Sequence, residues 1–106
     1  MLPKTRRIPR ELFKGIISRK KYSNSEHFTL LFSPHNTARF AISVSKKVSK
    51  KAVLRNRVRR RVYSAIREFV NTTKPGFYLL IAKPGSEKLQ DEKLQQELKS
   101  LVVSCR

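Results

Sequence analysis

The feature that most constrains the fold is the segment from about Lys50 to Val70, which has one apolar side when it is drawn as a helix. The sequence Lys74-Pro75-Gly76 ends this helix. A helix with a single apolar side is stable only when that side is packed, so the rest of the chain must supply a covering layer. The apolar residues fall within about a third of the circumference and are Leu54, Val58, Val62, Ala65, Ile66 and Phe69.

The opposite side of the same helix carries guanidinium groups. Exposed helix faces usually mix charges of both signs in (i, i+4) ion pairs, whereas this side has no acidic residue before Glu68. Arginine is suited to bidentate contact with phosphate or with base edges. A charged side often only solvates a helix, but this composition favours contact with nucleic acid. The residues on it are Arg57, Arg60, Arg61 and Arg67 with Asn56 and Ser64, and Arg55 and Arg59 lie at its border.

The charge of the whole chain supports the same interpretation. Its formal net charge is +18, from 25 Lys and Arg against 7 Asp and Glu, and such self-repulsion opposes compaction unless a polyanion binds. After Glu68 the signs are mixed, as on an ordinary solvated surface. Between Glu26 and Glu68 every Lys, Arg, Asp or Glu is basic: Arg39, Lys46, Lys47, Lys50, Lys51, Arg55, Arg57, Arg59, Arg60, Arg61 and Arg67.

Several classes of protein are disfavoured. The longest apolar run, Phe77 to Ala82, is far shorter than the roughly 18 residues of a membrane span, and Met1 to Arg10 lacks the apolar middle of a secretion signal. The single cysteine, Cys105, cannot form an internal disulfide, which fits the cytoplasm. His27 and His35 are too separated to form a metal cluster. We expect no membrane contact and no cofactor or metal held by the protein itself.

Shorter elements precede the long helix. Pro9 can open a short helix with Leu12, Phe13, Ile16 and Ile17 on one side, and Ser18 to Glu26 is predicted to be a connection. Residues His27 to Ser33 and Arg39 to Ser45 are predicted strands, joined by a turn that contains Pro34 and Asn36. In the second strand Phe40, Ile42 and Val44 alternate with Ala41, Ser43 and Ser45, the period of a half-buried strand.

Two elements follow the long helix. The continuous apolar run Phe77 to Ala82 predicts a central strand that is covered on both faces. A last helix is predicted from Ser86, a possible N-cap, to about Ser104, with Leu94, Leu98, Leu101 and Val102 facing inward. The 106 residues suit one domain, residues 1–106, of the α+β class. Its order is helix, strand, strand, helix, strand, helix, with the helices packed on a small sheet.

A resemblance to a known family rests on the segment from Arg39 to Arg60, which reads R-F-A-I-S-V-S-K-K-V-S-K-K-A-V-L-R-N-R-V-R-R. A strand that ends in S-K-K, a short connection and a helix that opens with A-V-x-R-N-R resemble the signature of the ribonuclease P protein family. The resemblance covers most of the chain, including the strand that ends in I-A-K at Lys83. It implies a fold like that of ribosomal protein S5 domain 2, with a left-handed strand–helix–strand crossover against the usual rule.

The resemblance also implies binding residues. The family's RNA-binding motif falls on Arg55, Asn56, Arg57, Arg59 and Arg60, preceded by Lys46 and Lys47. From the residues themselves, Lys50 and Lys51 extend the basic surface to the N-terminal end of the helix, where the helix dipole favours phosphate.

The family binds the single-stranded 5′ leader of precursor tRNA in a cleft between its first helix and the sheet. Phe13 matches an aromatic there, while Phe28, Phe32 and Arg39 are further candidates. Stacking of an unpaired base on an aromatic ring is physically sensible. The alternative for Phe13 is a core position, and both interpretations stay open, whereas for Phe28 and Phe32 the core is favoured.

The chain departs from the family at several positions. Ala41 and Ser49 stand where the family often has glycine. Tyr63 and Ser64 stand where the family commonly has an arginine and then an acidic or amide residue, and no Asp precedes Phe13. These departures concern individual RNA contacts and the edge of the cleft.

The function that the resemblance implies is that of the protein subunit of ribonuclease P. No catalytic constellation is visible in the sequence, and His27 and His35 have no fixed partner. Mg²⁺ held by the catalytic RNA would activate water, while the protein, a monomer when free, would bind that RNA and precursor tRNA. The main alternative is a structural protein bound to ribosomal RNA, and a weaker one is a helix-turn-helix regulator that binds DNA.

Overall fold

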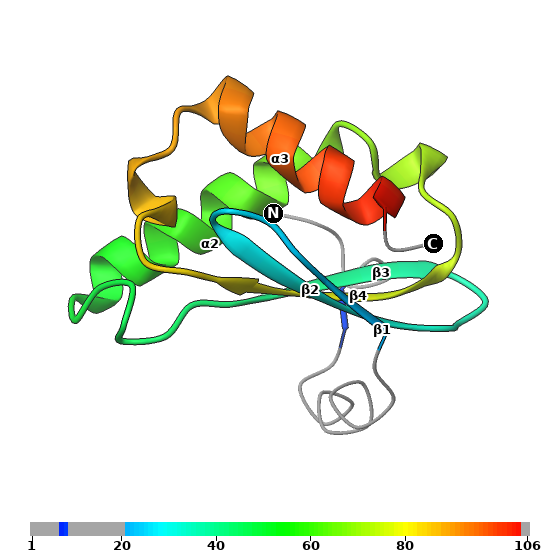
Figure 1. Cartoon of the computed structure of the whole chain (residues 1–106), viewed down its shortest axis with the longest axis horizontal. Helices are drawn as coiled ribbons and strands as arrows, with labels where there is room; N and C mark the ends of the chain where they lie inside the picture. The colour runs from blue at the N-terminus through cyan, green and yellow to red at the C-terminus, as the bar shows by residue number, and fades with distance from the viewer. Residues whose placement is uncertain (1–6, 9–20, 105–106) are drawn as a thin grey trace.

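A four-stranded sheet with two helices on one side forms the protein (Figure 1). The computed structural model describes residues 7–8 and 21–104, so the predicted first helix with Phe13, and Cys105, lie outside the described residues. The predicted α+β class is confirmed. The elements are β1 (Lys21–Asn24), β2 (Phe28–Ser33), β3 (Ala38–Ser43), α2 (Ala52–Arg67), the 3₁₀ turn η3 (Val70–Thr72), β4 (Gly76–Ala82), the 3₁₀ turn η4 (Ser86–Lys88) and α3 (Asp91–Ser104).

The strands lie in the order β1-β2-β4-β3. β4 pairs with β2 in the antiparallel sense and with β3 in the parallel sense, so that Leu80 lies between Leu30 and Ile42. This confirms the predicted central strand. The prediction of a connection over Ser18 to Glu26 is wrong for β1, because Lys21–Asn24 pairs with β2 at the edge of the sheet. An edge strand needs no apolar run, and K-Y-S-N has none.

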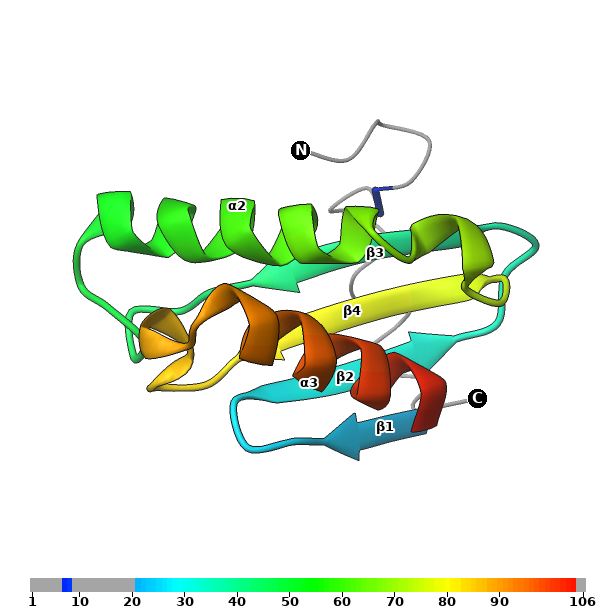
Figure 2. The ribbon, with the colours of Figure 1, turned by 90° about the horizontal axis from the view of Figure 1, so that it is seen from above.

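The connection from β3 through α2 to β4 is left-handed. Figure 2 views the sheet from the helix side: β3 and β4 both run to the left, α2 lies in front of the sheet, and β4 lies on the α3 side of β3. A right-handed crossover, the usual arrangement, would place β4 on the other side of β3. The handedness that the resemblance implied is therefore present.

The main core lies between the sheet and the two helices. Phe28, Leu30, Phe40 and Leu80 face the helices from the strands and are fully buried. The predicted inward residues of both helices lie opposite them, except that Leu54 is only half-buried. They are Val58, Val62, Ala65, Ile66 and Phe69 from α2 and the turn after it, and Leu94, Leu98, Leu101 and Val102 from α3.

An aromatic cluster lies against Gly76, the first residue of β4, and leaves no room there for a side chain. Tyr78 stacks on Phe40 with ring centroids 4.9 Å apart, and Phe32 is tilted against Tyr78 at 5.1 Å. Phe32 also lies over Gly76, where an added Cβ would approach its Cε2 to 2.2 Å, and φ at Gly76 is +157°. Glycine is required here because a side chain would displace the Phe32 ring.

The last helix starts later than predicted. Ser86 lies in η4, and α3 begins at Asp91, because Leu89 is extended, with ψ 138°, and packs against the main core. Ser86 is buried, and its Oγ has no hydrogen-bond partner, so it is not an N-cap.

The face of the sheet opposite the helices, here called the second face, has a smaller apolar cluster. It contains Leu31, Ala41, Leu79 and Ile8, with Phe77 and Ile81 packed against them. The Ile8 amide donates to the Phe40 carbonyl at 3.0 Å, so residues 7–8 extend the sheet beside β3. Within residues 7–8 and 21–104, no helix has the length and hydropathy needed to cross a membrane.

Candidate nucleic-acid interface

The outer side of α2 presents its guanidinium groups to solvent, as predicted for most of them. Arg57, Arg60 and Arg67 are exposed, together with Asn56 and Ser64, while Val58, Val62 and Ile66 are buried on the opposite side. Neither Arg57 nor Arg60 is hydrogen-bonded or ion-paired with another described residue. These two cations therefore remain available for an external anion.

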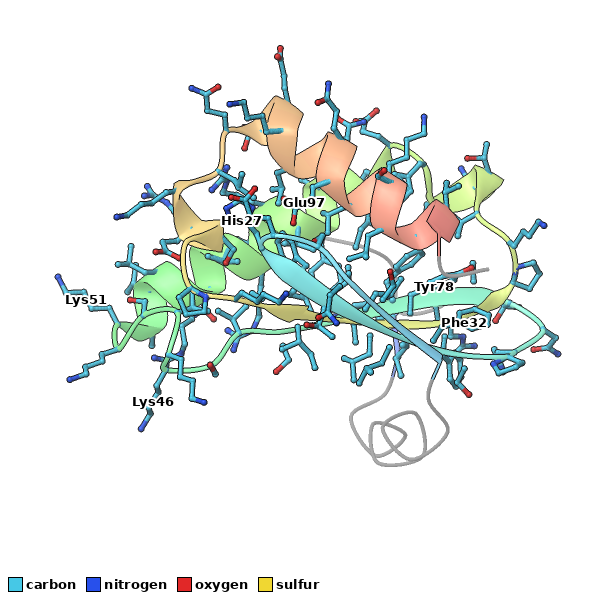
Figure 3. The ribbon with its side chains drawn as sticks, in the orientation of Figure 1. His27, Phe32, Lys46, Lys51, Tyr78 and Glu97 are labelled. Carbon is cyan, nitrogen blue, oxygen red and sulfur yellow. The ribbon has the colours of Figure 1, made fainter. Side chains whose placement is uncertain are left out.

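A lysine loop, residues 44–51, joins β3 to α2 at one end of the molecule. Val48 is buried and anchors the loop, and the Oγ atoms of Ser45 and Ser49 accept the amides of Lys47 and Lys51, both at 3.2 Å. Such serine-based turns fix a short connection locally. With both of its valines inward and its serines used in turns, the loop exposes all four lysines. Lys46 and Lys51 point away from the body in Figure 3, and Lys47 and Lys50 are also exposed.

Arg55 fastens this loop to the helix. Its Nη1 donates to the carbonyls of Ser49 and Lys50 at 3.0 and 2.9 Å. Those carbonyls belong to the residues just before α2, so Arg55, which is half-buried, positions the lysines relative to the arginines. Ser49, a departure from the glycine that the family often has, is therefore part of the turn itself.

A hollow of about 470 Å³ lies on the outer side of α2 between Val53, Asn56, Arg59 and Arg60. Arg59 donates to the Asn56 side-chain carbonyl, which holds both side chains at its edge. Val53 is 73% exposed, which makes it the most exposed of the large apolar residues in the described part of the chain. The motif residues Asn56, Arg59 and Arg60 thus lie together around an apolar surface.

Arg61 does not lie on the open outer side where the helical wheel placed it. It is half-buried and bound to the segment before α3: its guanidinium donates to the carbonyls of Glu87 and Leu89 and to the Asp91 carboxylate, the last at 3.0 Å. The predicted placement is wrong because η4 and α3 cover that flank of α2. Arg61 holds the two helices together.

Tyr63, another departure from the family, belongs to the core. It is 8% exposed and faces β3 and the segment at Arg7. Burial raises the pKa of the Tyr63 phenol above its usual range, although a hydrogen bond with the backbone of Ile42 and the charges of Arg7 and Arg59 oppose this. The wheel missed Tyr63 because it lies about 60° beyond Ile66 around the helix, outside the apolar side.

The candidate cleft residues divide between the two faces of the sheet. Phe28 is fully buried beneath the helices and cannot stack on a base, so its assignment to the cleft is wrong and its core position is confirmed. Phe32 also faces the helices and packs on Tyr78 (Figure 3), as the core interpretation predicted. Arg39 lies on the second face, in register with Phe77 of β4, and its Nε donates to the Thr37 hydroxyl at 3.3 Å.

Both histidines have partners, contrary to the expectation from the sequence. His27 Nδ1 lies 2.8 Å from Glu97 Oε1 of α3, and the Ser25 hydroxyl and the His27 amide donate to Glu97 Oε2 at 2.5 and 2.9 Å. Figure 3 shows His27 and Glu97 close together. The His35 ring contacts the Phe77 ring, tilted by 32° against it.

The pKa of Glu97 is set by these contacts. Burial raises it, but the hydrogen bonds from Ser25 and His27 outweigh burial and hold the pKa below its ordinary value. The Ser25 hydroxyl donates to Glu97 and not to the imidazole, so this is no activated nucleophile. No three His, Cys, Asp or Glu residues of the described part could hold a metal ion together.

Comparisons with known proteins identify the family. The sequence profile of the Ribonuclease P family matches residues 2–106. The ribonuclease P protein component of Microcystis aeruginosa is 36% identical, over 98% of this chain and 93% of that protein. The same component of a Picosynechococcus species is 35% identical, over 98% of this chain and 93% of that protein.

Solved structures of low sequence identity share the fold. The RNase P protein of Staphylococcus aureus superposes with a TM-score of 0.85 at 21% identity, covering 97% of each chain. The RNase P protein of Thermotoga maritima gives a TM-score of 0.81 at 23% identity, over 91% of this chain and 94% of that one. Profile, sequence relatives and fold agree, and the chain belongs to the ribonuclease P protein family.

Proposed function

We propose that this chain, as the protein subunit of ribonuclease P, binds the catalytic RNA through the outer side of α2 and the lysine loop. The observation that supports this most is the exposed pair Arg57 and Arg60, which have no partner in the described part of the chain. No carboxylate lies between Glu26 and Glu68 to neutralise them. Such a surface binds a polyanion by releasing the counterions of its phosphates.

The geometry of the lysine loop supports contact with folded RNA. Lys46 and Lys51 extend from the end of the molecule at which α2 begins (Figure 3). The first turn of α2 adds the partial positive charge of its unpaired amides, and it contains no acidic residue. Loop, helix end and helix side form one continuous basic surface, which suits the closely spaced phosphates of a folded RNA.

The second function in this proposal is to hold the single-stranded 5′ leader of precursor tRNA on the second face. Arg39 lies there and supplies a cation for its phosphates. Phe13 is kept as a candidate stacking residue, while Phe28 and Phe32 are left to the core, where they pack beneath the helices. The leader would then lie across the sheet, on the side opposite α2 and α3.

The chemistry in this proposal belongs to the RNA. Mg²⁺ ions bound by the RNA would activate the attacking water, and the protein would neutralise phosphates and position the leader, which lowers the entropic part of the barrier. The subunit would act in the cytoplasm, where its lone cysteine is compatible with a reducing environment, and as a monomer when free.

The two alternatives find less support. A structural protein of ribosomal RNA would share the charge, but the ribonuclease P family profile spans residues 2–106. A helix-turn-helix regulator needs a second helix joined by a short turn. Here β3 precedes α2 and β4 follows it in the described chain.

A reconstitution experiment tests the proposal. Precursor tRNA is incubated with the cognate ribonuclease P RNA alone, with RNA-free protein alone, and with both, at low and high Mg²⁺. We expect cleavage at low Mg²⁺ only with both components, slow cleavage by the RNA alone at high Mg²⁺, and none by the protein alone. Cleavage by RNA-free protein would overturn the assignment of chemistry, and no effect of the protein at low Mg²⁺ would overturn its role as a subunit.

A further inference from the structure

A pair of ring side chains in contact, tilted against each other, lies at the connection from β2 to β3. The centroids of the His35 and Phe77 rings are 4.0 Å apart, with an interplanar angle of 32°. His35 is exposed in the turn, and Phe77 is half-buried near the start of β4. In the register of the sheet Phe77 lies opposite both Ser33 and Arg39. Arg39 therefore lies on β3 directly beside the rings.

We infer that His35, Phe77 and Arg39 form a stacking site for an unpaired base of the leader, several nucleotides upstream of the cleavage site. This inference rests on the proposed leader binding and adds a site to it. An aromatic platform beside a cation is the usual means of binding single-stranded RNA, since a base stacks on the ring and its phosphate meets the charge.

The surroundings of the rings favour a nucleotide over other occupants. No carboxylate lies between Glu26 and Glu68, so the turn carries no charge that repels phosphate. Arg39 is held toward the turn by the hydrogen bond from its Nε to Thr37. Beyond Phe77 the second face continues with apolar Leu79 and Ile81, which offer nothing for base-specific hydrogen bonds. The site would bind by stacking and tolerate many sequences.

A core role for Phe77 does not account for His35. Phe77 packs inward against the small cluster that contains Leu31 and Leu79, and that packing needs no ring on its outer side. The imidazole nevertheless lies over it, tilted by 32°, so the outer face of the exposed His35 ring is the surface that a base would meet. Base and imidazole can stack because both are planar.

The position of the rings indicates how far along the leader they would bind. The turn before β3 and the lysine loop after it lie at opposite ends of the sheet (Figures 1 and 3). Six residues of β3 separate these ends, about 17 Å at roughly 3.3 Å for each step. If the catalytic RNA is bound at the lysine end, a leader strand enters there and reaches the rings only after it crosses the second face.

The test uses holoenzyme reconstituted with the cognate RNA and a series of precursor tRNAs whose leaders lengthen one nucleotide at a time. Dissociation constants are measured with the natural protein and with His35→Ala combined with Phe77→Leu, in which leucine keeps the apolar packing. The natural protein should bind more tightly as the leader grows. The variant should match it on the shortest leaders and then lose about fivefold or more at one length and beyond.

Two further variants make the result specific. His35→Tyr keeps Phe77 and places another aromatic ring in the turn, so this variant should bind the long leaders nearly as tightly as the natural protein does. Asn36→Ala, an exposed neighbour in the same turn, should bind every leader like the natural protein. Thermal melts of all variants should agree to within a few degrees.

Three outcomes would overturn the inference. The natural and double-variant proteins could give the same curve, which leaves the proposed leader binding intact but removes this site. The variant could weaken binding of leaderless tRNA equally, which would place the rings against another part of the RNA or in the fold. The natural protein could itself ignore leader length, in which case the proposed leader binding also fails.

Discussion

The two helices lie side by side on one face of the sheet, yet their outer sides differ. α2 presents arginines with no carboxylate among them until Glu68, and Arg57 and Arg60 lack partners in the described part of the chain. α3 mixes both signs, and its Glu97 binds the turn between β1 and β2 through Ser25 and His27.

The outer side of α2 is therefore suited to an external partner, whereas charged groups of α3 are used to hold the fold together. A cation that already has hydrogen-bond partners and a carboxylate in the protein gains less from binding phosphate, because those contacts must be exchanged for the new one. Two carboxylates of α3, Asp91 and Glu97, have partners within the protein, whereas Arg57 and Arg60 of α2 gain partners only when a polyanion binds. The location of carboxylates, more than that of lysines, therefore marks the interface.

The largest effect should come from removing unmatched charge. Arg57→Ala with Arg60→Ala should weaken binding of the catalytic RNA by about 3 kcal/mol, at about 1.5 kcal/mol for each charged hydrogen bond, which is roughly a hundredfold. The slope of log K against log salt should fall by about 0.7 to 0.9 for each lost contact. Binding titrations at several salt concentrations measure both quantities, and the melting temperature should not change.

The matched control removes the same charge from the other helix. Lys93→Ala with Lys99→Ala, both exposed on α3, lowers the net charge equally. The control should retain nearly all of the affinity and of the salt slope. An equal loss in both double variants would mean that net charge alone governs binding and that the outer side of α2 has no special role.

The amphipathic pattern predicted α2 and its buried side well, because the period of a helix determines which residues share a side. Arg61 was misplaced on the outer side: it lies seven residues from Leu54, only about 20° away around the helix, at the border of the apolar side. Its Asp91 partner, 30 residues away, was not visible in the local pattern. The partner of His27 is Glu97, 70 residues away, and no local signal could reveal it.

The edge strand β1 was also hard to predict from the sequence. β1 pairs on one side only, so burial places few demands on its four residues. The central strand β4 was the opposite case, because burial on both faces requires an unbroken apolar run. The lysine loop was correctly predicted to be basic, but its buried Val48 and its two serine turns appear only in the folded structure.

A smaller effect should follow from the carboxylate that supports α3. Glu97→Gln should lower stability by about 1.5 kcal/mol at neutral pH, because hydrogen bonds to a charged acceptor are lost. Since folding lowers the pKa of Glu97 below its ordinary value of 4.5, its contribution is complete above that value and is lost as the pH falls through the folded pKa. Melts of both proteins across this range should therefore converge at acid pH.

Glu26→Gln is the matched control for this prediction, because Glu26 is an exposed carboxylate in the same turn. It should melt like the natural protein at every pH. A difference between Glu97→Gln and the natural protein that persisted unchanged at low pH would show that shape, and not charge, makes this contact stabilising.

The smallest effect should come from the residue that connects the two helices. Arg61→Ala leaves the Glu87 and Leu89 carbonyls without their donor, so we expect a loss of about 1 kcal/mol, or roughly 4 to 8 °C in melting temperature. Asp91→Asn should lose less, about 0.3 kcal/mol, because the Asp91 side chain is 87% exposed. Chemical denaturation measures both losses.

RNA binding by Arg61→Ala tests most directly whether an arginine with internal partners differs from one without them, since Arg57 lies one turn away on the same helix. An arginine already bound to carbonyls and to Asp91 should contribute little to counterion release, so the salt slope should fall less than with Arg57→Ala. An equal fall would mean that Arg61 leaves its partners to contact RNA, as the wheel first suggested. In that case a matched charge would be no barrier to binding, and the contrast between α2 and α3 would lose its physical basis.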